Sequence, residues 1–589
     1  MQRASSSNSS NLSTTHIPSI DGLRALAVTA VVLYHLGIDW IPGGFLGVDL
    51  FFVISGYVIT RLILDSIESA NGLDIKEFYA ARIRRLLPGL LVLLIVTSLA
   101  MALFAPDSVR RFVSDVPFVL SGTNNWHLVA LHQDYFQAIG RPPLLQHTWS
   151  LAVEFQFYLI WPILLLFIWR RFGKQVVRRA ALLIATFSGT ALFLFSLQAD
   201  NATAGRISHI YFGTDTHSLG LFLGSALAVS WIPRNLTPNI SQRAQDFIDG
   251  IGFFGFVGLL CIFLFIDETN ATLYQVAFPL AGLFGCATII SIVHPASRFS
   301  PILSARFLLW IGQRSYGIYL WHWVVFQVTR PGADLTGSPF ALNVARVLLV
   351  LILADISLRA IEIPIRRGLV QNWFRGIKYR TKVMQKRQRI FIAAISAFTL
   401  LLTGSSIAVA WQRDQSIVVE VKPELELPQT VVSENSTGLW VTGDSVILGI
   451  RNKLDAAQDI ALINARVGRQ IQELITSVEE DKVKVGSSTV VFNVGNNNSV
   501  SREDMVKLME LLKDQPKIIV VNTAVPRTWR DGNNKIISEV VSKYPNAMLV
   551  DWAQIAENHP EFFAPDGVHL IEAGSDVYVA SILDALNVN

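Results

Sequence analysis

The chain has 589 residues, of which 51% are hydrophobic and only 16% are charged, and its mean hydropathy is +0.42. This composition excludes an ordinary soluble enzyme and requires membrane helices to make up much of the chain. The formal net charge of +4 balances 49 basic against 45 acidic residues, and nothing in it indicates a nucleic-acid partner.

Long apolar runs predict eleven membrane spans, each of roughly 17 to 23 residues, enough to cross a hydrocarbon core of about 30 Å. The runs begin near Ile20, Gly44, Leu86, Thr148, Ala180, Thr216, Ile248, Leu273, Phe307, Ala341 and Ile390. Every loop from an even-numbered to an odd-numbered span is basic, and Lys and Arg accumulate on the cytoplasmic side. We therefore predict a cytoplasmic N-terminus and an extracytoplasmic C-terminal domain.

The composition divides the chain into six parts. Residues 1–15 are rich in Ser, Asn and Thr, which predicts a disordered cytoplasmic tail without a cleavable signal. The expected parts after it are a membrane domain (16–367), a basic cytoplasmic loop (368–389), an eleventh span (390–411), an extracytoplasmic linker (412–437) and a soluble domain (438–589).

The first span carries two ionisable side chains, Arg24 near its inner end and His35 near its outer end. They are separated by roughly 16 Å along a helix axis. Ionisable residues inside spans indicate function, so a reaction path could run from one face toward the other. The alternatives are that Arg24 reaches back to the inner interface and that His35 is a polar cap at the outer interface.

Glu154 lies about two turns into the fourth span, which enters from outside, and we therefore expect it near the depth of His35. A His and Glu pair in a partly dry cavity is typical of a general base and the group that orients it.

A cytoplasmic cluster of Arg82, Arg84 and Arg85 lies on the amphipathic stretch 75–87. It is open to two interpretations. The cluster either sets the topology and contacts lipid headgroups, or it binds phosphate, because arginine forks match phosphate oxygens.

The membrane half resembles the acyltransferase-3 family over residues 17 to about 367. The matching motifs are Ser19-Ile20-Asp21-Gly22-Leu23-Arg24-Ala25, Tyr34-His35, Gly47-Val48-Asp49-Leu50-Phe51-Phe52, Phe78-Tyr79 with Arg82-Ile83-Arg84-Arg85, His147-Thr148-Trp149-Ser150-Leu151-Ala152-Val153-Glu154, Tyr316-Gly317-Ile318-Tyr319-Leu320-Trp321-His322 and Ile361-Glu362-Ile363-Pro364. Val324 and Leu358 stand where many members have Pro and Tyr.

This resemblance implies ten spans that take an acyl group, usually acetyl, from cytoplasmic acyl-CoA to an extracytoplasmic acceptor. It implies His35 as the essential base, with Glu154 beside it. It also implies that Arg24, Arg82 and Arg85 bind the acyl-CoA. An eleventh span would then carry a fused domain to the outside, which agrees with the predicted topology.

In the soluble part, short β-branched runs alternate with helical patterns, which predicts an α/β domain with a parallel, doubly wound sheet. The expected strands are 438–443, 459–464, 488–494, 517–522 and 547–551, and two of the expected helices are 471–480 and 502–513.

Polar residues follow several of these strands and should meet at their carboxyl ends. Ser445 would be a nucleophile if His569 takes its proton and Asp566 orients the His569 ring. The oxyanion would be stabilised by the backbone N–H groups of Ser445 and Gly468 and by the side chain of Asn497. Each motif alone is more often a loop or a helix cap, and the prediction depends on their occurring together.

Four blocks of this domain resemble an SGNH (GDSL-type) esterase or acyltransferase domain, and are most similar to the external domain of peptidoglycan O-acetyltransferase A-type enzymes. They are Thr442-Gly443-Asp444-Ser445-Val446, Val467-Gly468-Arg469-Gln470, Val494-Gly495-Asn496-Asn497 and Asp566-Gly567-Val568-His569-Leu570. The resemblance implies Ser445 as nucleophile, His569 as base and Asp566 as its orienter. The third block departs from the usual Gly-x-Asn-Asp form, so Asn497 or a neighbouring Asn supplies the oxyanion donor.

These observations together predict a polytopic α-helical membrane O-acyltransferase of a bacterial plasma (inner) membrane. It would move acetyl from acetyl-CoA through a Ser445 acyl-enzyme to a hydroxyl of an envelope glycan, with no bound cofactor or metal. The acceptor would be peptidoglycan, lipopolysaccharide O-antigen or another surface polysaccharide. The main alternative is a membrane-anchored carbohydrate esterase or deacetylase, although one span would suffice for an anchor. A transporter would explain the spans but would give no role to Ser445.

Overall fold

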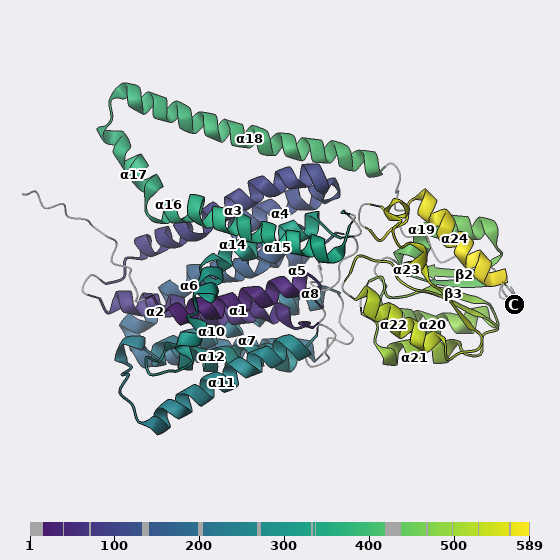
Figure 1. The fold of residues 1–589 in the computed structure, drawn as a ribbon, viewed down its shortest axis with the longest axis horizontal. Coiled ribbons are helices and arrows are strands. Elements are labelled where there is room, and N and C mark those ends of the chain that lie inside the picture. Colours follow the sequence, from purple (N-terminus) through teal and green to yellow (C-terminus); the bar gives the residue numbers. More distant parts are fainter. Residues whose placement is uncertain are drawn as a thin grey trace, which may run out of the picture.

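A helical bundle and a separate α/β domain make up the structure, which is a computed structural model (Figure 1). It describes residues 16–38, 40–69, 72–131, 141–197, 204–267, 273–331, 334–335, 337–418, 438–466, 469–497, 499–527, 529–564 and 567–587. The expected tail at 1–15 and residues 419–437 of the expected linker lie outside this set.

The bundle contains eighteen α-helices in the described residues. They are α1 (Pro18–His35), α2 (Gly47–Ile67), α3 (Ile75–Phe104), α4 (Val109–Ser121), α5 (Asn124–Ala130), α6 (Trp149–Phe172), α7 (Lys174–Ser196), α8 (Ala204–Phe212), α9 (Thr214–His217), α10 (Leu219–Ser230), α11 (Gln242–Phe265), α12 (Phe278–Val293), α13 (Ser300–Leu303), α14 (Arg306–Val328), α15 (Pro339–Ile356), α16 (Ile363–Arg366), α17 (Leu369–Arg375) and α18 (Lys382–Val418).

Eight helical segments of the described chain are long and apolar enough to cross a membrane, and all eight coincide with predicted spans. The other three predicted spans fall on α1, α10 and α14, which are helical but shorter or more polar. The span predicted from Thr216 contains only the end of α9 and the short helix α10, which are separated at Ser218. A multi-pass bundle is therefore present, and the count of eleven stays a prediction.

Close backbone contact holds α2 against α10 at the centre of the bundle. A Cβ added at Gly56 would lie 1.9 Å from the carbonyl oxygen of Leu221, and one added at Gly224 would lie 2.1 Å from that of Val53. Small residues are needed where membrane helices approach this closely, since van der Waals packing replaces the hydrophobic effect there. The two glycines therefore set the distance between α2 and α10.

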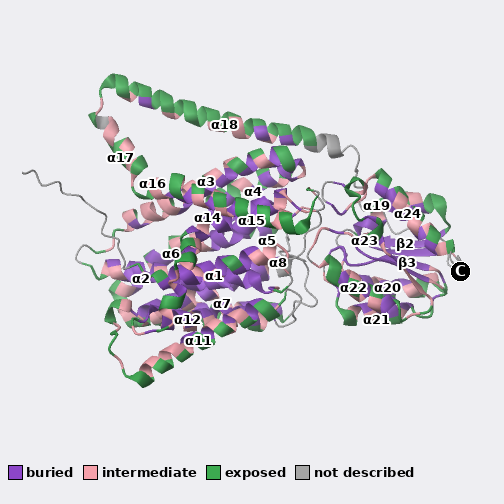
Figure 2. Cartoon of the chain, in the orientation of Figure 1, coloured by how far each residue is buried: buried purple, intermediate pink, exposed green. Residues whose placement is uncertain are grey.

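The last helix of the bundle differs from the others because most of its surface is exposed (Figure 2). α18 runs along one side of the bundle and contacts α3 and α4 (Figure 1). It extends beyond the predicted span 390–411 at both ends. The residues before that span, including Lys382 and Lys386, are good helix formers, and they continue the helix into the predicted basic loop.

The C-terminal domain contains the expected parallel sheet. Its strands are β1 (Leu439–Gly443), β2 (Ile460–Ala465), β3 (Val490–Asn493), β4 (Ile518–Val521) and β5 (Ala547–Val550), in the order β2-β1-β3-β4-β5. All four neighbouring pairs are parallel, and the register aligns Thr442 with Asn464 and with Phe492. The predicted strand positions and sheet type are confirmed.

Helices cover both faces of the sheet, as the alternation of the strands requires. They are α19 (Ser445–Ala457), α20 (Ile471–Val485), α21 (Arg502–Leu512), α22 (Arg530–Val541), α23 (Trp552–Ile555) and α24 (Glu572–Asn587). Val441 of β1 belongs to one hydrophobic core with Ile447 and Ile582, and its neighbour Trp440 belongs to the other core with Leu508. Successive side chains of a strand point to opposite faces, so each face has its own core.

The strand order places a crevice between β1 and β3. The chain leaves β1 toward β2 on one side and later enters β3 on the other, so the two connections diverge at this point. In doubly wound sheets, ligands bind at such a switch point beyond the carboxyl ends of the strands. Ser445 follows β1 and Asn497 follows β3, which brings both to this position.

Candidate active sites

The serine site starts with a tight turn from β1 into α19. Asp444 caps the helix, because its Oδ1 accepts a hydrogen bond of 2.9 Å from the backbone N–H of Val446. Gly443 has a φ of +159°, and a Cβ there would lie 1.9 Å from Asn493 Oδ1. Because glycine has no Cβ, Gly443 allows the side chain of Asn493, at the end of β3, to come this close.

Three asparagine side chains converge on the buried carboxylate of Asp444. Asn493 Nδ2 donates to Oδ1 at 2.8 Å, while Asn496 Nδ2 and Asn497 Nδ2 donate to Oδ2 at 2.9 and 3.0 Å. Asn493 also accepts from the backbone N–H of Asp444 at 3.0 Å. The block after β3 therefore anchors the turn that carries Ser445.

Ser445 begins α19 with only 5% of its surface exposed. Its Oγ has no hydrogen-bond partner among the described residues. His569 lies on the loop before α24, and it interacts electrostatically with Asp444, the neighbour of Ser445, whose pKa is raised by burial. The structure thus places two of the predicted catalytic residues in one region. Asp566, the predicted orienter, lies outside the described residues.

Asn497 is tied to two acceptors, since its Nδ2 also donates to the backbone carbonyl of Arg469 at 3.2 Å. Both N–H bonds of the amide are therefore used in this structure, and its role as an oxyanion donor stays a prediction. Gly468, the other predicted donor beside Ser445, lies outside the described residues.

Arg469 fastens the loop after β2 to the strand ends. Its guanidinium donates to the Asn464 carbonyl at 2.5 Å, to the Asn464 side chain at 2.7 Å and to Thr442 Oγ1 at 3.2 Å. Burial lowers the pKa of Arg469, and burial raises the pKa of Asp444 although several hydrogen bonds oppose the shift. Arg469 and Asp444 therefore hold the turn that carries Ser445 in place.

The membrane half brings His35 to a second histidine. His35 Nδ1 lies 3.1 Å from His322 Nε2, and His322 Nδ1 lies 2.7 Å from the backbone carbonyl oxygen of Tyr319. The His35 ring also meets the Trp323 ring edge on, with 4.9 Å between centroids. His322 belonged to a recognised motif, but no sequence signal identified it as the partner of His35.

A further polar group lies beside this pair. Tyr319 Oη donates to the His147 backbone carbonyl at 2.8 Å and lies 2.7 Å from Ser150 Oγ. The His147 ring lies 6.0 Å from the His322 ring. The α14 helix and the start of α6 therefore surround His35 with fixed polar groups.

The expected pairing of His35 with Glu154 is wrong in this structure. Glu154 accepts from Ser55 Oγ at 2.8 Å and from Tyr158 Oη at 2.7 Å. Depth along the bundle was estimated from sequence position, but the direction in which a side chain points depends on how α6 packs. Glu154 faces α2 and the arginines described next.

Three predicted acyl-CoA-binding residues, Arg24, Arg82 and Arg85, do gather in the structure. Arg24 interacts electrostatically with Arg85 and with Glu154, and Arg82 interacts with Arg85 and with Arg366. Arg24 Nη1 lies 3.9 Å from Asp21 Oδ1, a weak ion pair. The side chains of this cluster therefore present more positive than negative charge.

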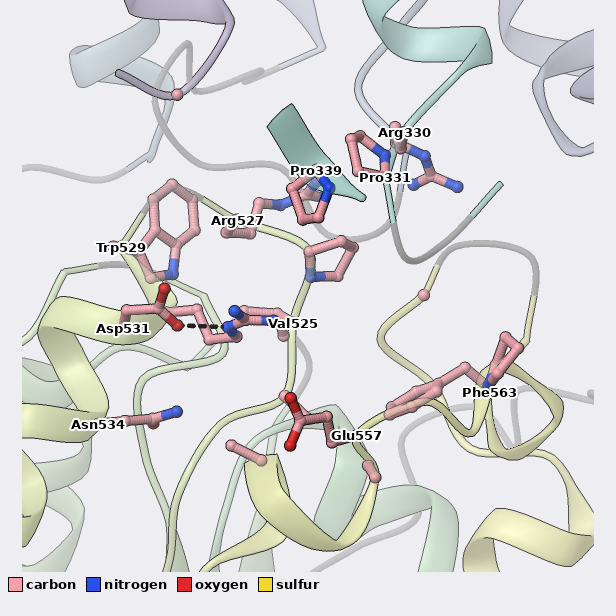
Figure 3. A pocket seen from close by; sticks show the side chains of 18 of the residues that line it. Arg330, Pro331, Pro339, Val525, Arg527, Trp529, Asp531, Asn534, Glu557 and Phe563 are labelled. Carbon is pink, nitrogen blue, oxygen red and sulfur yellow. Dashed lines mark hydrogen bonds and ion pairs between the residues drawn. The ribbon is translucent and has the colours of Figure 1, made fainter. Parts of the chain in front are cut away.

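A cavity of about 1470 Å³ lies between the end of the bundle that carries His35 and the C-terminal domain. His35, Trp323 and Phe326 line its bundle side, while Ala564 and Gly567, on the loop that carries His569, line its domain side. Figure 3 shows Arg330, Pro331 and Pro339 of the bundle together with Arg527, Trp529 and Glu557 of the domain. The cavity thus extends from His35 to the loop beside the serine site.

Among the residues that the structure describes, no three His, Cys, Asp or Glu side chains gather in a way that could hold a metal ion.

Comparison with known proteins matches both halves of the chain. The acyltransferase domain model of the acyltransferase-3 family matches residues 17–357. Peptidoglycan O-acetyltransferase OatA of Listeria monocytogenes is 32% identical, with 97% of this chain and 98% of that protein covered. O-acetyltransferase OatA of Staphylococcus aureus is also 32% identical, with 95% and 94% covered. The C-terminal catalytic domain of OatA from Streptococcus pneumoniae, solved with a methylsulfonyl adduct, is 28% identical, covers 26% of this chain and 93% of its own, and has a TM-score of 0.24.

Proposed function

Since the chain belongs to the acyltransferase-3 family and is an O-acetyltransferase of the cell envelope, we propose that it carries acetyl from cytoplasmic acetyl-CoA to a glycan hydroxyl through a Ser445 acyl-enzyme. The N-terminus would be cytoplasmic and the α/β domain extracytoplasmic, in a bacterial plasma membrane. Peptidoglycan is the proposed acceptor, because a relative that aligns over nearly the whole chain carries that substrate in its name.

The cavity between the two halves is the observation that carries this proposal. An esterase on a membrane anchor would need no contact between its catalytic loop and a histidine of the bundle. Here His35 and Gly567 line one cavity. An acetyl group delivered at His35 would therefore enter a cavity that is also lined by the loop that carries His569.

At the inner end, Arg24, Arg82 and Arg85 would hold the phosphates of acetyl-CoA by charge-assisted hydrogen bonds. Glu154 contacts Arg24 electrostatically and is held by Ser55 and Tyr158. Its role in the proposal is to position the arginines, and the base at the outer end is His35 alone.

At the outer end, the contacts of His35 and His322 determine which ring nitrogens carry protons when both rings are neutral. The Tyr319 carbonyl only accepts, so His322 Nδ1 donates to it and His322 Nε2 carries a lone pair. His35 Nδ1 then donates to His322 Nε2, which leaves the lone pair of His35 on Nε2. This is the atom that would accept a proton during acyl transfer.

At the serine site, Ser445 Oγ would attack the acetyl carbonyl carbon while its proton passes to His569. The bond between the acetyl group and its donor then breaks, and His569 gives that proton to the departing donor group, so that it is neutral again. The glycan hydroxyl would then attack the same carbon, give its proton to His569 and release Ser445 Oγ, which takes the proton back. The net result is one new ester on the glycan and an unchanged enzyme.

The test compares glycan-bound acetate in cells that carry Ser445→Ala or His35→Ala in the full chain. We expect both variants to accumulate in the membrane and both to leave the glycan unacetylated. The His35→Ala protein should still hydrolyse a soluble acetyl ester at Ser445. Normal glycan acetylation by the Ser445→Ala variant would refute the acyl-enzyme, and normal acetylation by His35→Ala would reduce the bundle to an anchor.

A further inference from the structure

Two of the three arginines at the end of the bundle that carries His35 share two carboxylates. Arg141 pairs with Asp107 at 3.0 Å and with Asp334 at 2.9 Å. Arg330 forms a two-point contact with Asp334, with Nε and Nη2 each 3.0 Å from a carboxylate oxygen. Asp107 and Asp334 are therefore ion-paired with Arg141 and Arg330. The third arginine, Arg346, forms an ion pair with neither carboxylate.

Arg346 is buried, and no carboxylate lies within ion-pair distance of it among the described residues, although Asp334 acts on it electrostatically from farther away. Only 7% of its surface is exposed, and its Nη1 and Nη2 donate to Asn343 Oδ1 at 2.7 Å and to the Phe326 carbonyl at 3.1 Å. Both acceptors are neutral. Among the described residues its Nε has no hydrogen-bond partner, and Arg346 is in no ion pair. A buried charge of this kind is unfavourable until an anion pairs with it.

The anion can reach Arg346 from the cavity and not from the lipid. The face of α15 that carries Arg346 also carries the buried Val350, while Phe340, Val344 and Leu348 on other faces are exposed. Arg346 lines the cavity together with Asn343 and His35. A phospholipid headgroup would have to pass between α14 and α15, whereas a ligand in the cavity meets Arg346 directly.

The opposite wall of the cavity adds no net positive charge. Arg527 and Arg530 line it together with three carboxylates, Asp531, Asp551 and Glu557, so this wall carries no excess of positive charge. The excess positive charge therefore belongs to the bundle wall. On the domain side, Figure 3 shows Trp529 at the cavity, where it is half-buried. Its indole is held in place, since Nε1 donates to the Gly495 carbonyl at 3.2 Å. Such a ring offers an apolar face on which a sugar can stack.

We propose that this cavity is a subsite for a carboxylate-bearing segment of the acceptor glycan, with Arg346 as the residue that binds the carboxylate and Trp529 as the surface on which a sugar ring packs. The proposal rests on the proposed function, because it takes the occupant of the cavity to be the acceptor. It assigns a specificity determinant that lies in the membrane half, outside the serine domain. A carboxylate would supply the missing negative charge and an acceptor for the Nε–H of Arg346.

Binding is the test, because it is measured without acetyl-CoA and is therefore independent of catalysis. The full-length protein in detergent is titrated with a carboxylate-bearing glycan oligosaccharide and with the same oligosaccharide after conversion of its carboxylates to amides. We expect wild type to bind the carboxylate form about tenfold or more tightly than the amide form. Arg346→Gln should abolish this preference, while Arg346→Lys should keep much of it, since charge is retained.

The control is Arg359→Gln, which removes a charge whose side chain is 67% exposed and which lies outside the cavity. It should leave the preference unchanged. Equal binding of both oligosaccharides by wild type, or an unchanged preference in Arg346→Gln, would overturn the subsite. A preference that appears only in vesicles with anionic lipid, and vanishes in neutral vesicles, would assign Arg346 to a headgroup and would also overturn it. Acetyl transfer is assayed separately, so a wild type that binds but does not transfer would refute the proposed function and leave the subsite standing.

Discussion

His35 and His322 are 287 residues apart in the sequence, and their ring nitrogens lie 3.1 Å from each other. The second nitrogen of His322 lies 2.7 Å from the Tyr319 carbonyl oxygen, which fixes the direction of the hydrogen bonds in the pair. We therefore predict that His322 is a positioning residue that, beside the backbone contact at Val31, helps to set the tautomer of His35. Its effect on acyl transfer should be measurable without any change in the acyl-CoA site.

Replacing His322 with Ala removes the acceptor for His35 Nδ1–H and releases the tautomer. We expect acetyl transfer to fall by roughly 10²-fold, the order of a lost acid–base contribution. The pH profile should change as well, because His35 alone would then titrate. His322→Gln, which retains an acceptor, should recover part of the rate. The matched control is His294→Ala, whose ring packs on Trp231 at 5.8 Å. An unaltered pH profile in His322→Ala would contradict the positioning role.

The arginine cluster makes a prediction for the inner end of the bundle. Arg85→Gln should raise the KM for acetyl-CoA by about tenfold, as expected for one charge-assisted contact to phosphate, with a smaller effect on kcat. Arg171→Gln is the control, since Arg171 is an exposed arginine at the end of α6 that contacts only the Phe172 ring at 5.4 Å among the described residues. Equal changes of KM in the two variants would mean that general cytoplasmic charge, and not a phosphate site, is responsible.

Asp444 should give the α/β domain a specific pH dependence. Burial raises its folded pKa above the ordinary value of 3.8, so the folded state holds the proton more tightly than the unfolded state. The stabilisation that Asp444 contributes is fully present below the pKa that Asp444 has in the unfolded chain. It is lost as the pH rises through the higher pKa that Asp444 has in the folded domain. The difference in unfolding free energy between wild type and Asp444→Asn should therefore fall with rising pH over that interval.

The same substitution should lower stability at neutral pH, because an amide Nδ2 would face the asparagine donors that now reach the carboxylate. A loss of about 1–3 kcal/mol is expected from one unsatisfied buried group. Asp455→Asn, at an exposed position of α19, serves as the control. Thermal denaturation over a pH series measures both effects, and a pH-independent difference would contradict the raised pKa.

Helix packing gives a prediction for stability. Gly56→Ala would place a Cβ 1.9 Å from the Leu221 carbonyl oxygen, so α2 and α10 must separate. Overpacking of this kind is destabilising by typically 1–3 kcal/mol. We expect a lower thermal midpoint and less protein in the membrane. Gly404→Ala in α18, where nothing lies within 4 Å of the added Cβ, should be neutral or slightly stabilising. Equal midpoints for the two variants would show that α2 and α10 can separate freely.

Much of the fold was predictable because its signals are local in the chain. Apolar runs gave eight spans that the structure retains, and β-branched runs gave all five strands within about two residues of their ends. The span predicted from Thr216 was harder to place, because its helix α10 (Leu219–Ser230) is short and follows the polar residues Thr214 to Ser218. Motifs also located Ser445 and His569, since residues at the carboxyl ends of parallel strands must meet.

What the sequence by itself determined is therefore the order of the two halves, the positions of their helices and strands, and the residue types that carry the chemistry. Only the tertiary structure decided which of these residues are partners. Residue spacing gives depth along a helix, but the direction of a side chain depends on how the helices pack, and so His35 pairs with His322 and Glu154 joins Ser55. The unpaired charge of Arg346 is likewise a property of the assembled bundle, because a missing partner is visible only when all neighbours are in place.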